Sequence, residues 1–178
     1  MAAHGMELIG AERVSTHGGS LRAVAQQTGG GKSVAPSVAQ LIDLEKKMGL
    51  DKAETYRDFG LRIDVLKAEL STLLRASKDA GRTIAAFGAP AKATTLMYHF
   101  DIGADLIDFI VDDSPLKQGL YSPGMHIPVV PSSAIEEHKP DDIVILAWNF
   151  ATPIMAKLDS FKASGGRFIV PLPSLETH

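Results

Sequence analysis

Residues 82–93 read Arg-Thr-Ile-Ala-Ala-Phe-Gly-Ala-Pro-Ala-Lys-Ala, an apolar run that opens into a loop of small residues. A helix-like run follows, and a second apolar run ends at Val111-Asp112-Asp113. Later, residues 143–149 read Ile-Val-Ile-Leu-Ala-Trp-Asn. Polar groups thus fall just past the ends of apolar runs, where open α/β sheets bind ligands at the carboxyl ends of their strands. The pattern predicts a nucleotide fold with an unusual phosphate loop.

From residue 82 onward, strand-like and helix-like runs alternate, which predicts a parallel sheet with helices on both faces. The expected fold class is α/β: a Rossmann-like, five-stranded, mostly parallel sheet, preceded by an N-terminal β-hairpin and a helical linker region. The expected strands lie near 82–87, 107–112, 127–130, 142–147 and 167–171. The expected helices lie near 91–101, 132–138 and 152–164.

The first 80 residues show a different pattern. Residues 6–14 and 20–26 read as two strands joined by a turn-rich segment. Residues 37–80 read as helix, with Gly49 ending one helix and Asp51 capping the next. We therefore expect three parts: a two-strand segment over 1–27, a linker with helices over 28–80, and a nucleotide- or substrate-binding domain over 81–178.

Length and composition indicate a cytoplasmic protein. The chain has 178 residues, enough to bury a substantial core. It has no cysteine, which excludes disulfides, thiolate zinc sites and a cysteine nucleophile. A net charge of −3 argues against a nucleic-acid partner. No apolar run approaches the roughly 20 residues of a membrane span, and no signal peptide is visible.

The loop at residues 88–93 has the chemistry of a phosphate site. A helix N-terminus offers unpaired N–H groups and a partial positive charge to an anion. Gly88, Ala89 and Ala91 are small enough to let a ligand approach the backbone, and Lys92 adds a cation. Asp112 follows Gly88 at about the spacing of a ribose-binding acid. The loop lacks the pattern G-x-G-x-x-G, and the alternative is that its small residues only pack the helix against the sheet.

The ends of the other strands supply further candidates. Trp148 and Asn149 follow one strand, and Lys117 lies shortly after Asp112. Because the carboxyl ends of parallel strands meet at one edge of a sheet, we expect a cleft above Gly88, Lys92, Asp112 and Asn149. We predict that this cleft binds a nucleoside diphosphate.

A second glycine cluster is not a phosphate site. Gly29-Gly-Gly-Lys-Ser33 ends like a P-loop, but that motif needs a glycine five positions before Gly31, where Gln26 stands. Pro36 follows, and no large core strand precedes the cluster. The segment is interpreted as a flexible linker.

His17 is the candidate catalytic residue. It lies between Thr16 and a pair of glycines, in a joint where the backbone can pass close to a ligand. A neutral imidazole can accept a proton near pH 7. The alternative is a turn histidine without a role. His126 could line the same cleft as Lys117, and since no pair of histidines has metal-site spacing, no metal is expected.

Six segments in order resemble the C-terminal region of the SAM-dependent C-methyltransferases, a family with members that act on nucleotide-linked keto-deoxysugars. The resemblance runs from about residue 6 to 173, nearly the whole chain. The segments are His17-Gly-Gly-Ser-Leu-Arg22, Phe87-Gly-Ala-Pro-Ala-Lys92, Ile110-Val-Asp-Asp-Ser-Pro-Leu-Lys-Gln-Gly119, Ser122-Pro-Gly-Met-His-Ile-Pro128, Leu146-Ala-Trp-Asn149 and Arg167-Phe-Ile-Val-Pro171.

The resemblance implies a domain organisation. Complete members have a zinc-binding domain, a SAM-binding methyltransferase domain and then this domain, and residues 6–27 look like the last two strands of the methyltransferase sheet. Zinc cysteines and a SAM loop are absent here. The chain therefore looks like a fragment or a truncated relative, with SAM as the cofactor of the complete enzyme and no cofactor bound tightly to this chain. Its expected partners are a nucleotide-sugar-like small molecule and a SAM-binding domain.

The resemblance also implies residue roles. His17 matches a candidate base that removes the proton α to the ketone, after which the carbanion or enolate attacks the SAM methyl group. Some members carry a carboxylate just before this histidine, where Thr16 stands here, and many have glycine at the position of Ala93. The substrate-binding candidates are Gly88, Ala89, Lys92, Asp112, Lys117, Trp148 and Asn149.

Three functions stay open from the sequence. The first is the substrate-binding part of a C-methyltransferase, inactive as this chain alone. The second is a stand-alone nucleotide- or CoA-type binding module. The third, an NAD-dependent oxidoreductase, rests on the spacing from Gly88 to Asp112 but lacks the glycine fingerprint.

The two N-terminal strands also predict assembly. An isolated hairpin is marginal in water, and its open edges invite pairing with another chain. We expect residues 6–27 either to pair between two copies, giving a homodimer, or to pack back on the helices of residues 37–80. The homodimer is the favoured expectation, since strand pairing satisfies the backbone as well as the side chains.

Overall fold

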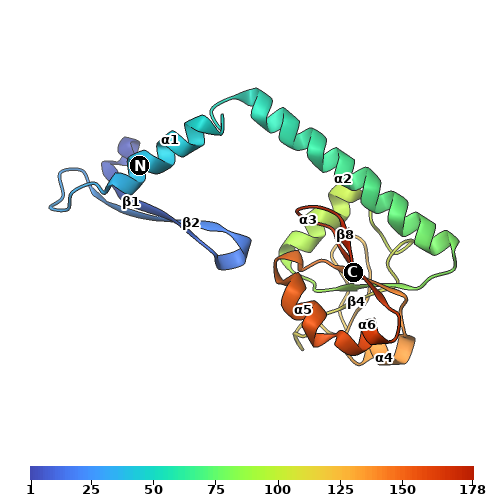
Figure 1. The fold of residues 1–178 in the computed structure, drawn as a ribbon. Helices are drawn as coiled ribbons and strands as arrows, with labels where there is room; N and C mark the ends of the chain where they lie inside the picture. Colours follow the sequence, from blue (N-terminus) through green and yellow to red (C-terminus); the bar gives the residue numbers. More distant parts are fainter. The chain divides into compact units, whose positions relative to one another are not determined.

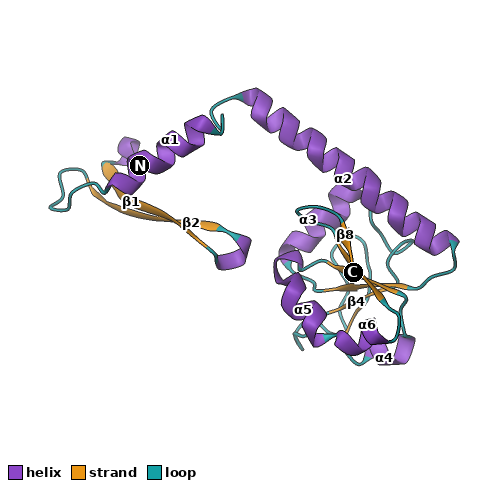
Figure 2. Cartoon of the chain, viewed as in Figure 1, coloured by secondary structure: helices purple, strands orange, loops and turns teal.

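The computed structural model describes all 178 residues, which form two compact units, residues 1–61 and 62–178. Figure 1 traces the chain along both units, and Figure 2 marks their helices and strands. The first unit holds a hairpin and a helix, and the second holds a larger sheet between helices. None of the helices is both long enough and apolar enough to cross a membrane.

The hairpin of the first unit confirms the two predicted N-terminal strands. β1 (Met6–Val14) pairs antiparallel with β2 (Ser20–Gln27), with one irregularity in register between Leu8 and Gly10. Short 3-10 turns precede the hairpin (η1, Ala2–His4) and close its tip (η2, Thr16–Gly18).

A helix covers β1. α1 (Pro36–Lys47) packs against this strand, where Ile9 and Ala11 are buried. The Ala35 N–H donates to the Ile9 carbonyl at 2.8 Å, and the Ala11 N–H donates to Ser37 Oγ at 3.3 Å. The segment therefore packs back on a helix of its own chain, one of the two predicted arrangements, and backbone groups of β1 find partners outside the hairpin.

α1 ends before Gly49, as predicted, and that glycine has the left-handed φ of 68°. α2 (Ala53–Asp79) begins two residues after Asp51, so Lys52 rather than Asp51 immediately precedes the helix. Within the second unit, Leu70 and Leu74 of α2 are fully buried. Their spacing of four residues keeps both on one helix face, which packs into the core.

The second unit contains one six-stranded sheet in the order β5-β4-β3-β6-β7-β8. The five strands β3 to β7 are parallel and correspond to the five that were predicted, whereas β8 runs antiparallel to β7. The predicted count of five strands was wrong, because β8 is two polar residues long and carries no apolar pattern. The bounds are β3 (Ile84–Phe87), β4 (Phe109–Val111), β5 (Val129–Val130), β6 (Asp142–Ile145), β7 (Arg167–Val170) and β8 (Glu176–Thr177).

Helices lie on both faces of this sheet because its strands alternate two sets of apolar side chains. Ile84 and Ala86 of β3 join one core with α2 and α3, while Ala85 and Phe87 join a second core with α4 and α6. The predicted helix over 152–164 is interrupted at the buried Leu158. The helical bounds are α3 (Ala91–Phe100), α4 (Ala134–His138), η3 (Trp148–Phe150), α5 (Ala151–Lys157) and α6 (Asp159–Ala163).

Candidate functional site

The site is built around β3, where the strand order reverses. From β3 the chain proceeds through β4 to β5 on one side of the sheet, and then through β6 to β7 on the other. Ligands of open α/β sheets bind outside the carboxyl ends of the strands at such a reversal. All seven predicted substrate-binding residues lie in the segments that directly follow β3, β4 and β6, either in a loop or in the first turn of the helix after it.

Gly88 begins the β3–α3 loop (residues 88–90). Its N–H donates to the Val111 carbonyl at 2.7 Å, which ties the loop to the end of β4. Its φ is 91°, and a Cβ at this position would lie 2.7 Å from the Cβ of Ala147. A side chain therefore fits neither the backbone conformation nor the space, and glycine lets the loops after β3 and β6 come into contact.

Asp112 holds the neighbouring loops together. Its carboxylate accepts the Ala89 N–H at 2.7 Å, the Ser114 N–H at 2.9 Å and the Lys117 ammonium at 3.1 Å. Burial raises the pKa of Asp112, but the hydrogen bonds from Ala89, Ser114 and Lys117 outweigh it, so that the pKa lies below its usual value. Both carboxylate oxygens have protein donors, which gives Asp112 a structural task that needs no ligand.

Lys92 lies in the first turn of α3. Its Nζ stands 4.1 Å from the ring centroid of Trp148, close enough for a cation–π contact, and it forms no salt bridge. Desolvation by burial lowers the pKa of Lys92. Pro90 occupies the N-cap position and provides no side-chain cap. The edge of the sheet thus presents a helix N-terminus and a cation that has no carboxylate partner.

A second charged cluster, formed by Asp113 and Lys157, lies near the carboxyl end of β4. Lys157 Nζ lies 2.6 Å from Asp113 Oδ1, which also accepts the Ser132 hydroxyl at 2.8 Å. The hydrogen bond from Lys157 lowers the pKa of Asp113. Sequence reasoning missed Lys157 as a site residue. It lies on α5, 65 positions after Lys92, and no motif in its neighbourhood indicates that it reaches the strand ends.

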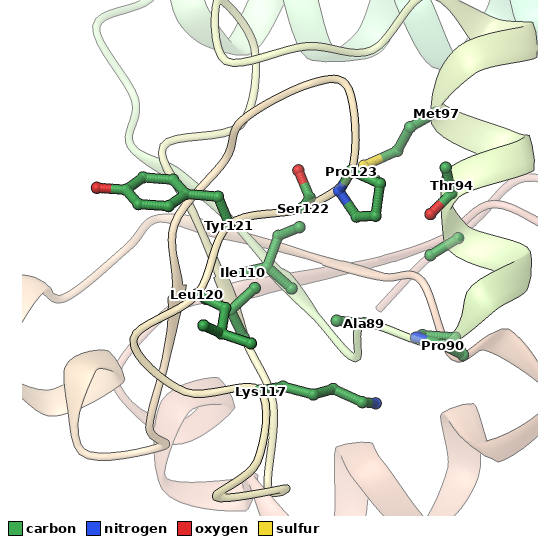
Figure 3. Close-up of a pocket in the computed structure, with 12 residues that line it drawn as sticks. Ala89, Pro90, Thr94, Met97, Ile110, Lys117, Leu120, Tyr121, Ser122 and Pro123 are labelled. Carbon is green, nitrogen blue, oxygen red and sulfur yellow. The ribbon is translucent and has the colours of Figure 1, made fainter.

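An apolar pocket lies on the β4–β5 side of α3. Its volume is about 250 Å³, and its walls come from the start of α3, from β4 and β5, and from residues 117–123. In Figure 3, Ile110 and Leu120 lie close together in it, while the ring of Tyr121 points away from the other labelled side chains. Of the predicted substrate-binding residues, Ala89 and Lys117 line this pocket, and sequence reasoning did not anticipate its other walls.

His17 belongs to the first unit. It is exposed at the tip of the hairpin, within η2, and has a left-handed backbone conformation with φ 54° and ψ 28°. His126 is also exposed, with φ 53°, in the loop before β5. No three His, Cys, Asp or Glu side chains gather closely enough to hold a metal ion.

The glycine cluster at residues 29–33 forms a loop that is hydrogen-bonded to the side chain of Gln26. The side-chain amide of Gln26 donates to the Lys32 carbonyl at 2.7 Å, and its oxygen accepts the Lys32 N–H at 3.1 Å. The residue that breaks the P-loop pattern is thus the one that organises this loop. The arrangement leaves no phosphate cradle of the P-loop kind.

Comparison with known proteins decides the family. Residues 15–173 match the family described as the C-methyltransferase C-terminal domain. The chain belongs to this family. It is 34% identical over 170 residues, 96% of its length, to the C-methyltransferase NovU of Streptomyces niveus. The chain spans only 40% of the length of that relative.

The family match includes every predicted site residue, from His17 to Asn149. Among solved structures, the UDP-D-quinovosamine 4-dehydrogenase of Vibrio fischeri is 12% identical, with a TM-score of 0.37 over 52% of this chain and 79% of that one. Similarity at this level supports no statement about the function of this chain.

Proposed function

We propose that this chain is the substrate-binding part of a SAM-dependent C-methyltransferase that acts on a nucleotide-linked keto-sugar. The strand order supports a Rossmann-like sheet, since β5-β4-β3-β6-β7-β8 corresponds to the order 3-2-1-4-5-6 of that fold. In this proposal the nucleoside diphosphate lies across the β3–α3 loop, at the point where the order reverses.

The observation that carries the proposal is the position of Lys92. Its ammonium is partly buried at the N-terminus of α3, faces the Trp148 ring and lacks a salt bridge. The ammonium and the helix N-terminus are both positive, so an anion beside them would be stabilised by both. A diphosphate would accept hydrogen bonds from Lys92 and from the first N–H groups of α3.

Each remaining candidate has a distinct task in the proposal. Gly88 and Ala89 let the diphosphate approach the backbone. Asp112 fixes Ala89 and Lys117 in place through Oδ2, and Oδ1, which accepts only the Ser114 N–H, can accept a further hydrogen bond from the ligand. Asn149, exposed after Trp148, reaches toward the sugar.

SAM would be held outside this chain. In this proposal the nucleoside diphosphate occupies the β3–α3 loop, and residues 29–33 are organised by hydrogen bonds to Gln26, so neither glycine-containing segment is assigned to SAM. We therefore propose a SAM-binding methyltransferase domain as the partner of this chain, and no catalysis by the chain alone. In the complete enzyme, His17 accepts the proton from the carbon α to the ketone.

The test is calorimetry with dTDP, UDP, CoA, NAD and SAM. Lys92→Ala is expected to weaken binding of the nucleoside diphosphate by roughly 1–3 kcal/mol, the contribution of a charge-assisted hydrogen bond. Lys162→Ala removes an exposed lysine of α6 and serves as the control. Equal affinities of both variants and the parent for every diphosphate would refute the proposal. Binding of CoA alone would favour the CoA-type module.

A further inference from the structure

The apolar pocket on the β4–β5 side of α3 and the Lys92–Trp148 pair lie on opposite sides of the β3–α3 loop. Ile110 of β4 and Val129 of β5 line the pocket, whereas Trp148 follows β6, on the other side of β3. Pro90 of the loop itself belongs to the pocket wall. A diphosphate on this loop would therefore have one end directed into the pocket and the other directed toward Trp148.

We propose that the pocket holds the nucleobase, an inference that rests on the proposed function. The base then lies over β4 and β5, the diphosphate crosses the β3–α3 loop, and the sugar lies on the side of Trp148 and Asn149. This orientation directs the reacting end of the ligand away from Lys117 and Leu120.

The side chains that line the pocket favour a nucleobase over a sugar. Side chains such as Met97, Ile110, Leu120 and Pro123 offer carbon and sulfur surfaces to a ligand. A sugar would bury several hydroxyl groups there without partners, which is unfavourable. A nucleobase has two flat faces that bury well and a polar edge that needs few hydrogen bonds.

The size of the pocket agrees with one ring system. Its volume of about 250 Å³ lies below the roughly 300–1,000 Å³ of pockets that enclose a whole drug-sized ligand. A complete nucleotide sugar would not fit inside. The phosphates and the sugar must then lie outside the pocket, along the edge of the sheet.

Thr94 supplies a polar group for the edge of the base. It lines the pocket from the first turns of α3, and Figure 3 shows its hydroxyl beside the apolar side chains. The other polar side chains of the wall have partners or point away: Lys117 is paired with Asp112 at 3.1 Å, the Ser122 hydroxyl accepts the Ile127 N–H at 3.0 Å, and the ring of Tyr121 points away from the other labelled side chains (Figure 3). Thr94 is therefore the residue through which the pocket distinguishes one base from another.

The experiment compares ligands with and without a base on the intact chain. Thr94→Leu fills the pocket and is expected to weaken dTDP and UDP binding at least about tenfold, while binding of inorganic pyrophosphate, followed by ligand-observed NMR, stays unchanged. Thr95→Leu changes the adjacent exposed residue, which does not line the pocket, and should alter neither affinity.

A second variant tests whether the effect of leucine at position 94 is due to disruption of the fold. Thr94→Val keeps the shape of the side chain and removes its hydroxyl. This variant should change the order of the affinities for dTDP, UDP, ADP and GDP, while its thermal melting temperature stays close to that of the parent. Equal weakening of dTDP and pyrophosphate by Thr94→Leu, or no change with either Thr94 variant, would overturn the base pocket. Parent protein that binds pyrophosphate and all four nucleotides equally would overturn it too. Failure to bind any diphosphate would overturn the proposed function itself.

Discussion

At the scale of a single residue, the close packing of Gly88 leads to a testable prediction. Gly88→Ala is expected to destabilise the fold by about 2–5 kcal/mol, because alanine disfavours a φ of 91° and its Cβ would lie 2.7 Å from that of Ala147. Gly81→Ala is the matched control. Gly81 has a φ of 75° with no atom within 4 Å of an added Cβ, so only the conformational cost of roughly 1–2 kcal/mol applies. Urea denaturation measures both, and equal losses would contradict the close contact.

His17 carries the catalytic prediction. In a complete enzyme that contains this chain, His17→Asn should lower turnover about 10²–10⁴-fold, the usual contribution of a general base. Asparagine is the suitable replacement because it tolerates the left-handed conformation that His17 adopts. Nucleotide affinity should stay unchanged, and His4→Asn serves as the control. Near-normal turnover of the His17 variant would remove this residue from the mechanism.

At the scale of the secondary-structure elements, one carboxylate joins the amino ends of neighbouring strands. Asp142 begins β6 and is fully buried, and it accepts hydrogen bonds from Arg82 at 2.7 Å and from Arg167 at 2.8 Å. Arg167 also donates to Ser77 Oγ of α2 at 2.7 Å. The network links α2 to the first residues of β6 and β7 and to the segment just before β3, on the edge opposite the candidate site.

Asp142 therefore controls the stability of the sheet. Asp142→Asn should cost about 3–5 kcal/mol, as expected when one partner of a buried ion pair is removed. Asp141→Asn, at the exposed neighbouring position, should cost less. Chemical denaturation at pH 7 compares them, and equal losses would show that the buried network adds nothing.

The same network predicts an acid dependence. Burial raises the pKa of Asp142, but the hydrogen bonds from Arg82 and Arg167 outweigh it, so the folded-state pKa lies below the usual value. The carboxylate then stabilises the fold above the unfolded-state pKa of about 3.9, and this contribution disappears as the pH falls through the lower folded-state pKa. Denaturation between pH 2 and 7 should show this loss in the parent and a smaller one in Asp142→Asn.

At the scale of the whole molecule, the N-terminal hairpin predicts a homodimer. Leu21 and Val24 of β2 are 56% and 49% exposed, although both are large and apolar. Because α1 covers β1, we expect a second copy to pair with β2. Sedimentation should show a dimer for the intact chain and a folded monomer after deletion of residues 1–50, since the second unit keeps both of its cores. A monomeric intact chain at high concentration would refute the dimer.

The sequence alone determined the parts whose signals are local. Alternating apolar residues located the hairpin and five strands, and the loop after β3 was recognised from small residues in the place where a strand gives way to a helix. These features depend on periodicity and turn chemistry over a few neighbouring positions. For the same reason β8, two polar residues without a pattern, could not be predicted.

The tertiary structure decided which side chains meet. It engaged Asp112 with Ala89, Ser114 and Lys117, brought Lys157 to Asp113, and formed a pocket between α3 and residues 117–123. Such contacts depend on how the two faces of the sheet pack against helices that are distant in the chain. Periodicity shows which face of an element is buried, but the partner of each polar group follows only from the packed fold, because burial requires that every such group find one.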